Sequence, residues 1–190
     1  MEFNDFFIIR VIIFTLGSLF LIKLSWKSLR NTSSHGFYRF FAFEGILALV
    51  LMNIPFWTKN PFSSLQLISW FLLFFSILFV SQGLHLLRKK GGSIENRGAQ
   101  PENLSFENTT DLVTEGVFKY IRHPMYSSLI LLAWGAFFKF ITIFGFFIAI
   151  IVTVFLIATA KLEEKENILF FGVSYEDYMK TTKIFFPYLL

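Results

Sequence analysis

Long apolar segments constrain this 190-residue chain more than any other feature of its sequence. Three of them are each about as long as a helix that spans roughly 30 Å of hydrocarbon: Phe6–Leu24, Phe37–Trp57 and Leu65–Leu87. A fourth, Met125–Ala160, is almost twice that length, so we interpret it as two spans that turn around Lys139–Thr142. The sequence therefore predicts an all-α, polytopic membrane protein with five transmembrane helices, at about residues 6–24, 37–57, 65–87, 125–140 and 142–160.

Composition agrees with a chain built for the bilayer. Hydrophobic residues make up 55% of the sequence and charged residues only 16%, which is too apolar for a soluble domain. The first span is too long for the apolar core of a signal peptide and lacks a small-residue cleavage site. The chain contains no cysteine, which excludes disulfides, zinc–thiolate sites and a cysteine nucleophile. We predict no metal site and no nucleic-acid partner.

The distribution of basic residues predicts the orientation of the chain. Lys59 alone lies in the second connection and Lys139 alone in the fourth, whereas the first, third and C-terminal segments are rich in lysine and arginine. The positive-inside rule then places the N-terminus outside and the C-terminus in the cytoplasm. The loop 88–122 and the C-terminal segment 161–190 are expected to be cytoplasmic. The protein would be a multi-pass protein of a cell inner membrane, or of the endoplasmic reticulum in a eukaryote.

The C-terminal segment is predicted to be helical in two parts. A helix continuing from the fifth span should break at Gly172 and restart at Ser174, whose hydroxyl and Asp177 resemble a capping box. Tyr175 and Tyr178 would then share the apolar face of an interfacial helix.

Two short motifs carry the chemistry. Pro124 suits the first turn of a helix, so the sequence RHP marks the entry of the fourth span. Glu163 and Glu164 mark the exit of the fifth span. If these spans form an antiparallel hairpin, His123 and Glu163 meet at one membrane face, where a helix N-terminus and Arg122 favour an anion. The alternative is structural: Arg122 anchors in headgroups while His123 and Glu163 hydrogen-bond each other.

A family resemblance adds to these observations. The stretch LVTEGVFKYIRHPMY, followed by EEKENILFFGVSYEDY and a near-terminal proline, resembles the isoprenylcysteine carboxyl methyltransferase family, whose superfamily of integral-membrane methyltransferases also includes phospholipid methyltransferases. The likeness covers about Asp111–Pro187. It implies one membrane methyltransferase domain over residues 1–190 that binds S-adenosylmethionine in a cytoplasm-facing pocket, without a Gly-rich Rossmann loop. The residues implied to bind the cofactor are Thr110, Asp111, Leu112, Val113, Phe118, Arg122, His123, Pro124, Met125, Tyr126, Glu163 and Glu164.

The acceptor is expected to be lipidic or a small apolar molecule that enters from the bilayer. Family members that act on carboxyl groups carry an arginine four residues before the paired glutamates, where this chain has Thr159. A carboxylate is best held by a planar guanidinium. Lys161 is a possible substitute, but it points about 200° around the helix from position 159. We therefore predict a lipid amine, such as a phospholipid headgroup, or another apolar nucleophile.

Lone polar residues supply the remaining candidates. Glu44 is an ionisable group inside the second span and so a functional candidate, with a structural hydrogen bond as the alternative. His85 near the end of the third span is a second candidate proton acceptor, and Lys161 completes the predicted catalytic set. His35 is expected to be solvated in a basic loop, and Arg10 to snorkel outward.

Two other functions remain open from sequence. An NADPH-dependent membrane reductase of sterols or other isoprenoids shares a similar C-terminal architecture, although such enzymes are usually longer. A non-enzymatic membrane scaffold would not need RHP and the paired glutamates at one face. The sequence predicts no obligate protein partner besides the lipid bilayer.

Overall fold

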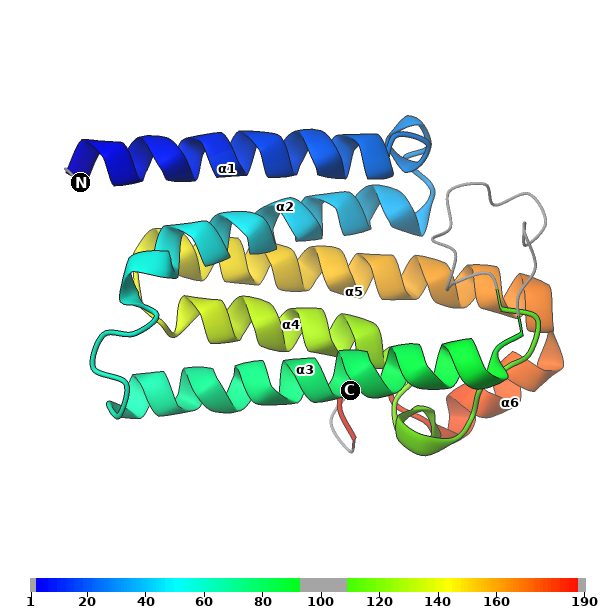
Figure 1. Ribbon diagram of the computed structural model, residues 1–190. Coiled ribbons are helices and arrows are strands. Elements are labelled where there is room, and N and C mark those ends of the chain that lie inside the picture. The colour runs from blue at the N-terminus through cyan, green and yellow to red at the C-terminus, as the bar shows by residue number, and fades with distance from the viewer. Residues whose placement is uncertain (1–2, 93–108, 188–190) are drawn as a thin grey trace.

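The computed structural model of the protein describes residues 3–92 and 109–187. Five helices lie side by side along one direction, and a short sixth helix crosses one end (Figure 1). Within the described residues no strand forms, although an isolated parallel bridge pairs Ile121 with Lys183. The helices are α1 (Phe3–Leu24), α2 (His35–Asn53), α3 (Ser64–Lys90), α4 (Pro124–Phe137), α5 (Ile143–Phe171) and α6 (Val173–Thr181). Residues 93–108 of the predicted loop 88–122, and 188–190 of the C-terminal segment, lie outside the described residues.

Four of these helices, α1, α2, α3 and α5, are long and apolar enough to cross a membrane. The structure thus confirms an all-helical fold with several apolar helices. The fourth predicted span differs, because α4 has 14 residues and a length of about 21 Å. A full crossing takes about 20 residues. The helix ends at Phe137 rather than near residue 140, and the remaining residues form the turn before α5.

Local sequence explains where the helices begin. Ser34 caps α2 by accepting a hydrogen bond from the Gly36 N–H, and Ser63 accepts one from Gln66 at the start of α3. Thr142 caps α5 in the same way, through the N–H of Gly145. These side chains satisfy N–H groups that have no partner within their own helix.

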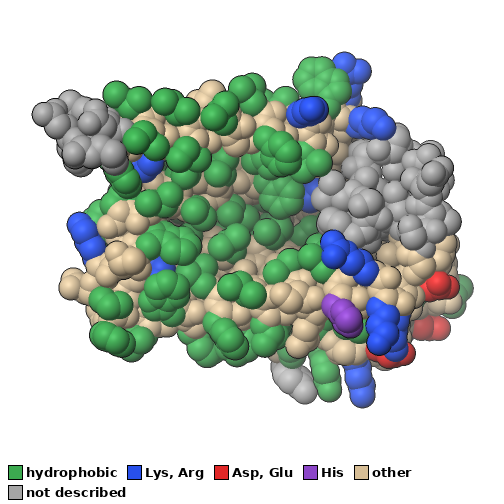
Figure 2. All heavy atoms as spheres, in the orientation of Figure 1, with side chains coloured by type: hydrophobic (Ala, Val, Ile, Leu, Met, Phe, Trp, Pro, Cys, Tyr) green, Lys and Arg blue, Asp and Glu red, His purple; other side chains and the backbone are tan. Residues whose placement is uncertain are grey.

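The short helix α4 forms the centre of the bundle, with α2, α3 and α5 packed around it. Its small residues allow α3 to approach closely: Ser69 donates to the carbonyl of Gly135 and Ser76 to that of Ser128, at 2.7 and 2.8 Å. From α2, the Asn53 amide donates to the Ala136 carbonyl. The hydrophobic core lies where α2, α4 and α5 meet, and many other large hydrophobic side chains are exposed on the outside of the helices (Figure 2).

Helix α1 lies on the outer side of α2, and polar contacts connect the two. Ser18 donates to a carboxylate oxygen of Glu44 at 2.7 Å. Arg10 reaches the carbonyl of Met52 at 3.5 Å and that of Phe6 in its own helix. The guanidinium thus reaches toward the neighbouring helix and toward the N-terminal end of α1, which is the direction in which Arg10 was predicted to snorkel.

The turn between α4 and α5 falls at Lys139, as predicted. Its ammonium is buried, donates to the Gln66 side chain at 3.0 Å and lies 3.3 Å from the centre of the Trp70 ring. The hydrogen bond and the cation–π contact together stabilise a positive charge that is buried in this turn.

Two predictions for the C-terminal segment need correction. The break at Gly172 is present, with φ of +61°, but α6 begins at Val173 and has no side-chain cap, so Ser174 and Asp177 form no capping box. Asp177 pairs with Lys180 instead. Tyr175 and Tyr178 are buried against the bundle rather than facing a membrane interface.

Candidate active site

Glycine and proline shape the segment that leads into α4. Gly116 has φ of +57°, a conformation that strains residues with side chains, and it opens a short 3-10 turn over Gly116–Lys119. Pro124 is the first residue of α4, where its missing N–H removes no helical hydrogen bond. His123 is therefore held immediately before the helix, at its N-cap position.

Residues Thr182–Phe186 form a segment that we call the C-terminal strap, and it holds the segment before α4 in place. The two segments run side by side and exchange backbone hydrogen bonds, and Ser127 of α4 adds a side-chain hydrogen bond to the strap. Phe185 is also buried, and its ring lies 6.5 Å from that of His123. The hydrogen bonds are Arg122 N–H to Lys183 carbonyl (2.8 Å), His123 N–H to Ile184 carbonyl (3.1 Å), Lys183 N–H to Tyr120 carbonyl (3.0 Å) and Ser127 hydroxyl to Phe185 carbonyl (2.6 Å).

Arg122 connects three parts of the chain. Its Nε donates to Glu164 on α5 at 2.6 Å, and its Nη1 donates to the carbonyls of Thr182 and Met179. Both charged side chains are more than nine-tenths buried. Because a guanidinium offers several donors in a fixed plane, one side chain can satisfy a carboxylate and two carbonyls together. The alternative interpretation, in which Arg122 anchors in lipid headgroups, is not what the structure shows.

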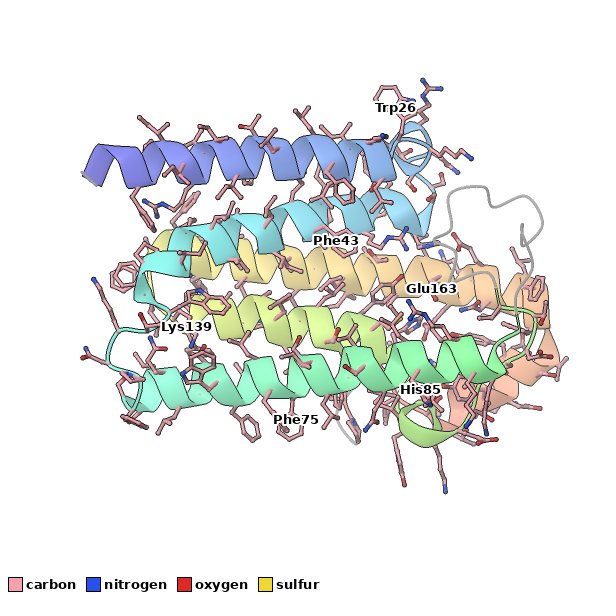
Figure 3. The ribbon with its side chains drawn as sticks, viewed as in Figure 1. Trp26, Phe43, Phe75, His85, Lys139 and Glu163 are labelled. Carbon is pink, nitrogen blue, oxygen red and sulfur yellow. The ribbon has the colours of Figure 1, made fainter. Side chains whose placement is uncertain are left out.

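A cavity of about 370 Å³ lies above this turn, at the end of the bundle where α2 begins and α5 ends. Its walls come from α2, α3, α4, α5, α6 and the segment 109–126. Figure 3 labels Phe43 on α2 and Glu163 on α5, which face this space from two sides. The predicted residues that line it are Asp111, Leu112, Val113, Phe118, Arg122, His123, Pro124, Met125, Tyr126 and Glu163.

His123 and Glu163 lie together in this cavity although 40 positions separate them in sequence. The His123 Nδ1 atom is 3.8 Å from a Glu163 oxygen, and Nε2 is 3.6 Å from an oxygen of Glu164. Tyr126 stacks on the imidazole, with ring centres 5.4 Å apart. The buried Nε2 has no hydrogen-bond partner among the described residues, which is typical of a group that meets a ligand.

Tyrosines of α6 close the cavity on the side of α5. Tyr178 donates its hydroxyl to the carbonyl of Phe118 at 2.6 Å, and Tyr175 contacts the amide of Asn167. Burial raises the pKa of both tyrosines above its ordinary value, and the Glu163 carboxylate raises that of Tyr175 further. Both hydroxyls therefore stay protonated at physiological pH and act as neutral hydrogen-bonding groups.

Comparison with known proteins agrees with this geometry. The family model for phospholipid methyltransferases matches residues 65–172, a region that contains α3, α4, α5 and most of the cavity wall. The chain belongs to the phospholipid methyltransferase family. It is therefore an integral-membrane methyltransferase, which favours methyl transfer over the reductase and scaffold alternatives.

Individual relatives of this phospholipid methyltransferase family member are distant. Methanethiol S-methyltransferase from Pseudomonas deceptionensis is 27% identical over 147 residues, which cover 77% of this chain and 48% of the relative. The protein of the same name from Crocosphaera subtropica is 26% identical over 76 residues, covering 40% of this chain and 29% of the relative. The chain thus spans less than half the length of these relatives. No solved structure matches it.

Several predicted residues lie outside the cavity lining. Glu164 is behind it, paired with Arg122, and Thr110 hydrogen-bonds the Gly91 carbonyl and Asp111. The three predicted catalytic residues are not among those that line it either: Glu44 bonds Ser18 between α1 and α2, and His85 (Figure 3) and Lys161 are exposed.

The prediction about the acceptor rested on a missing guanidinium, and the structure removes that premise. Thr159 is fully buried and donates to the carbonyl of Phe155 in its own helix. Arg39 of α2, however, lines the cavity and is buried. The cavity therefore contains an arginine that sequence spacing alone did not place there, and a carboxylate acceptor is not disfavoured on this ground.

Sequence reasoning also missed part of the cavity wall. Asn167 and Phe171 follow Glu163 at intervals of four residues, so one face of α5 carries all three, and this spacing was available as a signal. Arg39 and Phe43 are likewise four apart on α2. No sequence signal shows, however, that these two faces point into one space.

The Arg122 contacts generate a stability prediction. Replacing Arg122 with Gln removes one partner of a buried ion pair and leaves the Glu164 charge uncompensated. We expect the free energy of unfolding to fall by about 3–5 kcal/mol, measured by thermal denaturation of the purified protein in detergent. Arg88→Gln, at an exposed position near the end of α3, is the matched control. Equal denaturation temperatures for the two variants would contradict this role.

Proposed function

We propose that the protein transfers a methyl group from S-adenosylmethionine to a lipidic or small apolar acceptor at the cytoplasmic face of the membrane. The observation that carries this proposal is a single cavity with walls of two kinds. Asp111, His123 and Glu163 provide a polar side, whereas Phe43, Val80, Leu84 and Leu129, which belong to the helices α2, α3 and α4, provide an apolar side. A polar cofactor and an apolar acceptor can therefore occupy adjoining parts of one space.

The residues present fit the cofactor. S-adenosylmethionine supplies an electrophilic methyl group on a sulfonium, and carries an ammonium, a carboxylate, ribose hydroxyls and an adenine. Glu163 lines the cavity with a partly exposed carboxylate that can accept from the ammonium or the ribose. Phe118 and Tyr126 offer ring faces to the adenine or the sulfonium. The buried Nε2 of His123 awaits a hydrogen-bond partner.

Catalysis of this kind asks the protein mainly to position its reactants. Methyl transfer is an in-line displacement, so a nucleophile held close to the methyl carbon gains much of its rate from orientation. His123 donates a backbone hydrogen bond to the strap, which Arg122 also contacts, and Tyr126 stacks on the His123 ring. The polar wall is thereby fixed before ligands bind, which reduces the entropy lost on binding.

The acceptor we propose is an apolar nucleophile, and the two candidates are a small thiol and a lipid amine. The relatives are named as methanethiol S-methyltransferases, which supports a thiol. A thiol or a protonated amine must lose a proton before it attacks, whereas a carboxylate need not. Since Glu44 and His85 lie outside the cavity lining, Asp111 and Glu163 are the carboxylates placed to receive that proton.

We expect S-adenosylhomocysteine to bind the purified protein. The substitutions His123→Ala and Glu163→Gln should each weaken this binding. Losing a hydrogen bond to a charged group costs about 1.5–3 kcal/mol, or roughly ten-fold to more than a hundred-fold in Kd. Isothermal titration calorimetry measures the effect, with the exposed Glu176→Gln as a control. Affinity equal to the parent in both cavity variants, or binding of NADPH in place of S-adenosylhomocysteine, would contradict the proposal.

The cytoplasmic orientation needs its own test. The chain has no cysteine, so Thr58→Cys and Ser174→Cys each introduce a single thiol at an exposed position, at opposite ends of the bundle. In intact cells we expect an impermeant maleimide to label the cysteine at position 58 and to label position 174 only after lysis. The reverse pattern would separate the cavity from cytosolic cofactor.

The acceptor class is tested by transfer of a labelled methyl group in membranes that contain the protein. Methanethiol or a short alkanethiol, phosphatidylethanolamine and farnesylcysteine are compared as acceptors, and Glu163→Gln serves as the inactive reference. We expect the thiol or the phospholipid amine to be labelled well above farnesylcysteine. A strong preference for farnesylcysteine would show that the acceptor is a carboxylate.

A further inference from the structure

Arg39 is a charged cavity-lining residue for which neither the sequence motifs nor the family comparison provides a role. It lies in the second turn of α2, outside the matched region 65–172, and is only 4% exposed. Among the described residues that line the cavity, the arginines are Arg39 and Arg122. A guanidinium at a cavity wall is a donor of two parallel hydrogen bonds and a fixed positive charge.

Arg122 is already engaged by the protein. Its Nε is bound to Glu164 and its Nη1 to backbone carbonyls of Met179 and Thr182, so these donors hold the fold together. Arg39 comes from the other side of the cavity, on α2, where one of its contacts is with His35.

A pair of residues behind Arg39 fixes its position. His35, one turn earlier on α2, is 1% exposed, and its Nδ1 lies 2.6 Å from a carboxylate oxygen of Glu166 on α5. Its Nε2 lies 3.5 Å from Nη1 of Arg39. With a proton on Nδ1, the imidazole can donate to Glu166 while its Nε2 accepts from Arg39, so one ring connects the carboxylate to the guanidinium. The expectation that His35 is simply solvated is therefore wrong.

We propose that Arg39 binds the anionic group of a ligand in this cavity, a carboxylate or a phosphate, with His35 and Glu166 as positioning residues. The inference rests on the proposed function, because it assigns the charges of the cavity to parts of the ligands. Asp111 and Glu163 provide negative charge for the cationic groups, and Arg39 on α2 provides positive charge for the anionic one. Two sources carry such an anion: the amino-acid carboxylate of the cofactor, and an acidic group on the acceptor.

The first experiment compares two ligands by calorimetry. S-adenosylhomocysteine carries the amino-acid carboxylate, whereas 5′-methylthioadenosine has the same nucleoside and sulfur without it. If the cofactor is the source of the anion, Arg39→Gln should raise the Kd for S-adenosylhomocysteine by about ten-fold to a hundred-fold. The Kd for 5′-methylthioadenosine should change little. Arg39→Lys should recover part of the loss, because it restores the charge without the planar pair of donors. Arg30→Gln, at an exposed position nearby, is the matched control.

The second experiment tests the acceptor as the source. If Arg39→Gln binds S-adenosylhomocysteine normally, we expect its KM for acceptors with a phosphate or carboxylate to rise at least ten-fold, while its KM for a neutral alkanethiol stays unchanged. Glu166→Gln should raise the Kd or KM of the same ligand, but by a smaller factor. It weakens the contact that positions His35 behind Arg39, while the guanidinium itself remains. Should Arg39→Gln fail to fold, as judged by thermal denaturation, Arg39→Lys and Glu166→Gln carry the comparison.

The outcomes separate this inference from the proposed function. Parent-like binding of S-adenosylhomocysteine and parent-like KM for acidic acceptors in Arg39→Gln would overturn the role of Arg39 and leave the methyltransferase proposal standing. Failure of the unmutated protein to bind S-adenosylhomocysteine would instead overturn the proposed function, and this inference with it.

Discussion

The buried contact between Arg122 and Glu164 is the interaction on which the rest of the site depends. It joins the turn before α4 to α5, and the same guanidinium reaches the carbonyls that end α6 and begin the strap. Buried ion pairs often contribute little net stability, because removing both charges from water is costly. Here every contact also fixes a relative position. With Arg122 in place, backbone hydrogen bonds to the strap and the stacked Tyr126 ring hold His123 at the cavity wall.

The shortness of α4 makes room for the cavity. A fourth helix as long as its neighbours would fill the space among α2, α3 and α5 along the whole bundle. Since α4 begins only at Pro124, that space is lined at one end by an irregular segment, from Thr109 to His123. Irregular backbone in a membrane protein is tolerated where it is buried or lines a cavity. Hydrogen bonds to the strap satisfy backbone groups between Tyr120 and His123, and the Gly91 carbonyl satisfies the N–H groups of Thr110 and Asp111. The strap thus helps to keep this wall of the cavity in place.

Much of the fold, and one part of the site, could be predicted from sequence. Apolar length located the helices, and the antiparallel hairpin of α4 and α5 brought His123 and Glu163 together because the start of α4 lies beside the C-terminal half of α5. The error about His35 has a physical cause: this residue was judged by its local surroundings in a basic loop, whereas Glu166 of α5, distant in sequence, contacts its ring. Glu44 bonds Ser18 of α1, which is the structural alternative that its sequence context also allowed. Arg39 was missed because no local pattern shows which face of α2 meets the cavity.

The position of the charges also limits where a proton from the acceptor can go. Glu44 and His85 are outside the cavity lining, and Glu44 is hydrogen-bonded to Ser18, so neither is placed to receive the proton directly. Both α6 tyrosines remain protonated, because burial raises their pKa, and so neither is a base. Among the cavity-lining residues that the structure describes, Asp111 and Glu163 are the carboxylates. If Glu163 is occupied by the cationic end of the cofactor, Asp111 is the carboxylate left to accept the proton. It comes directly after Thr110, whose hydroxyl donates to it and so orients it.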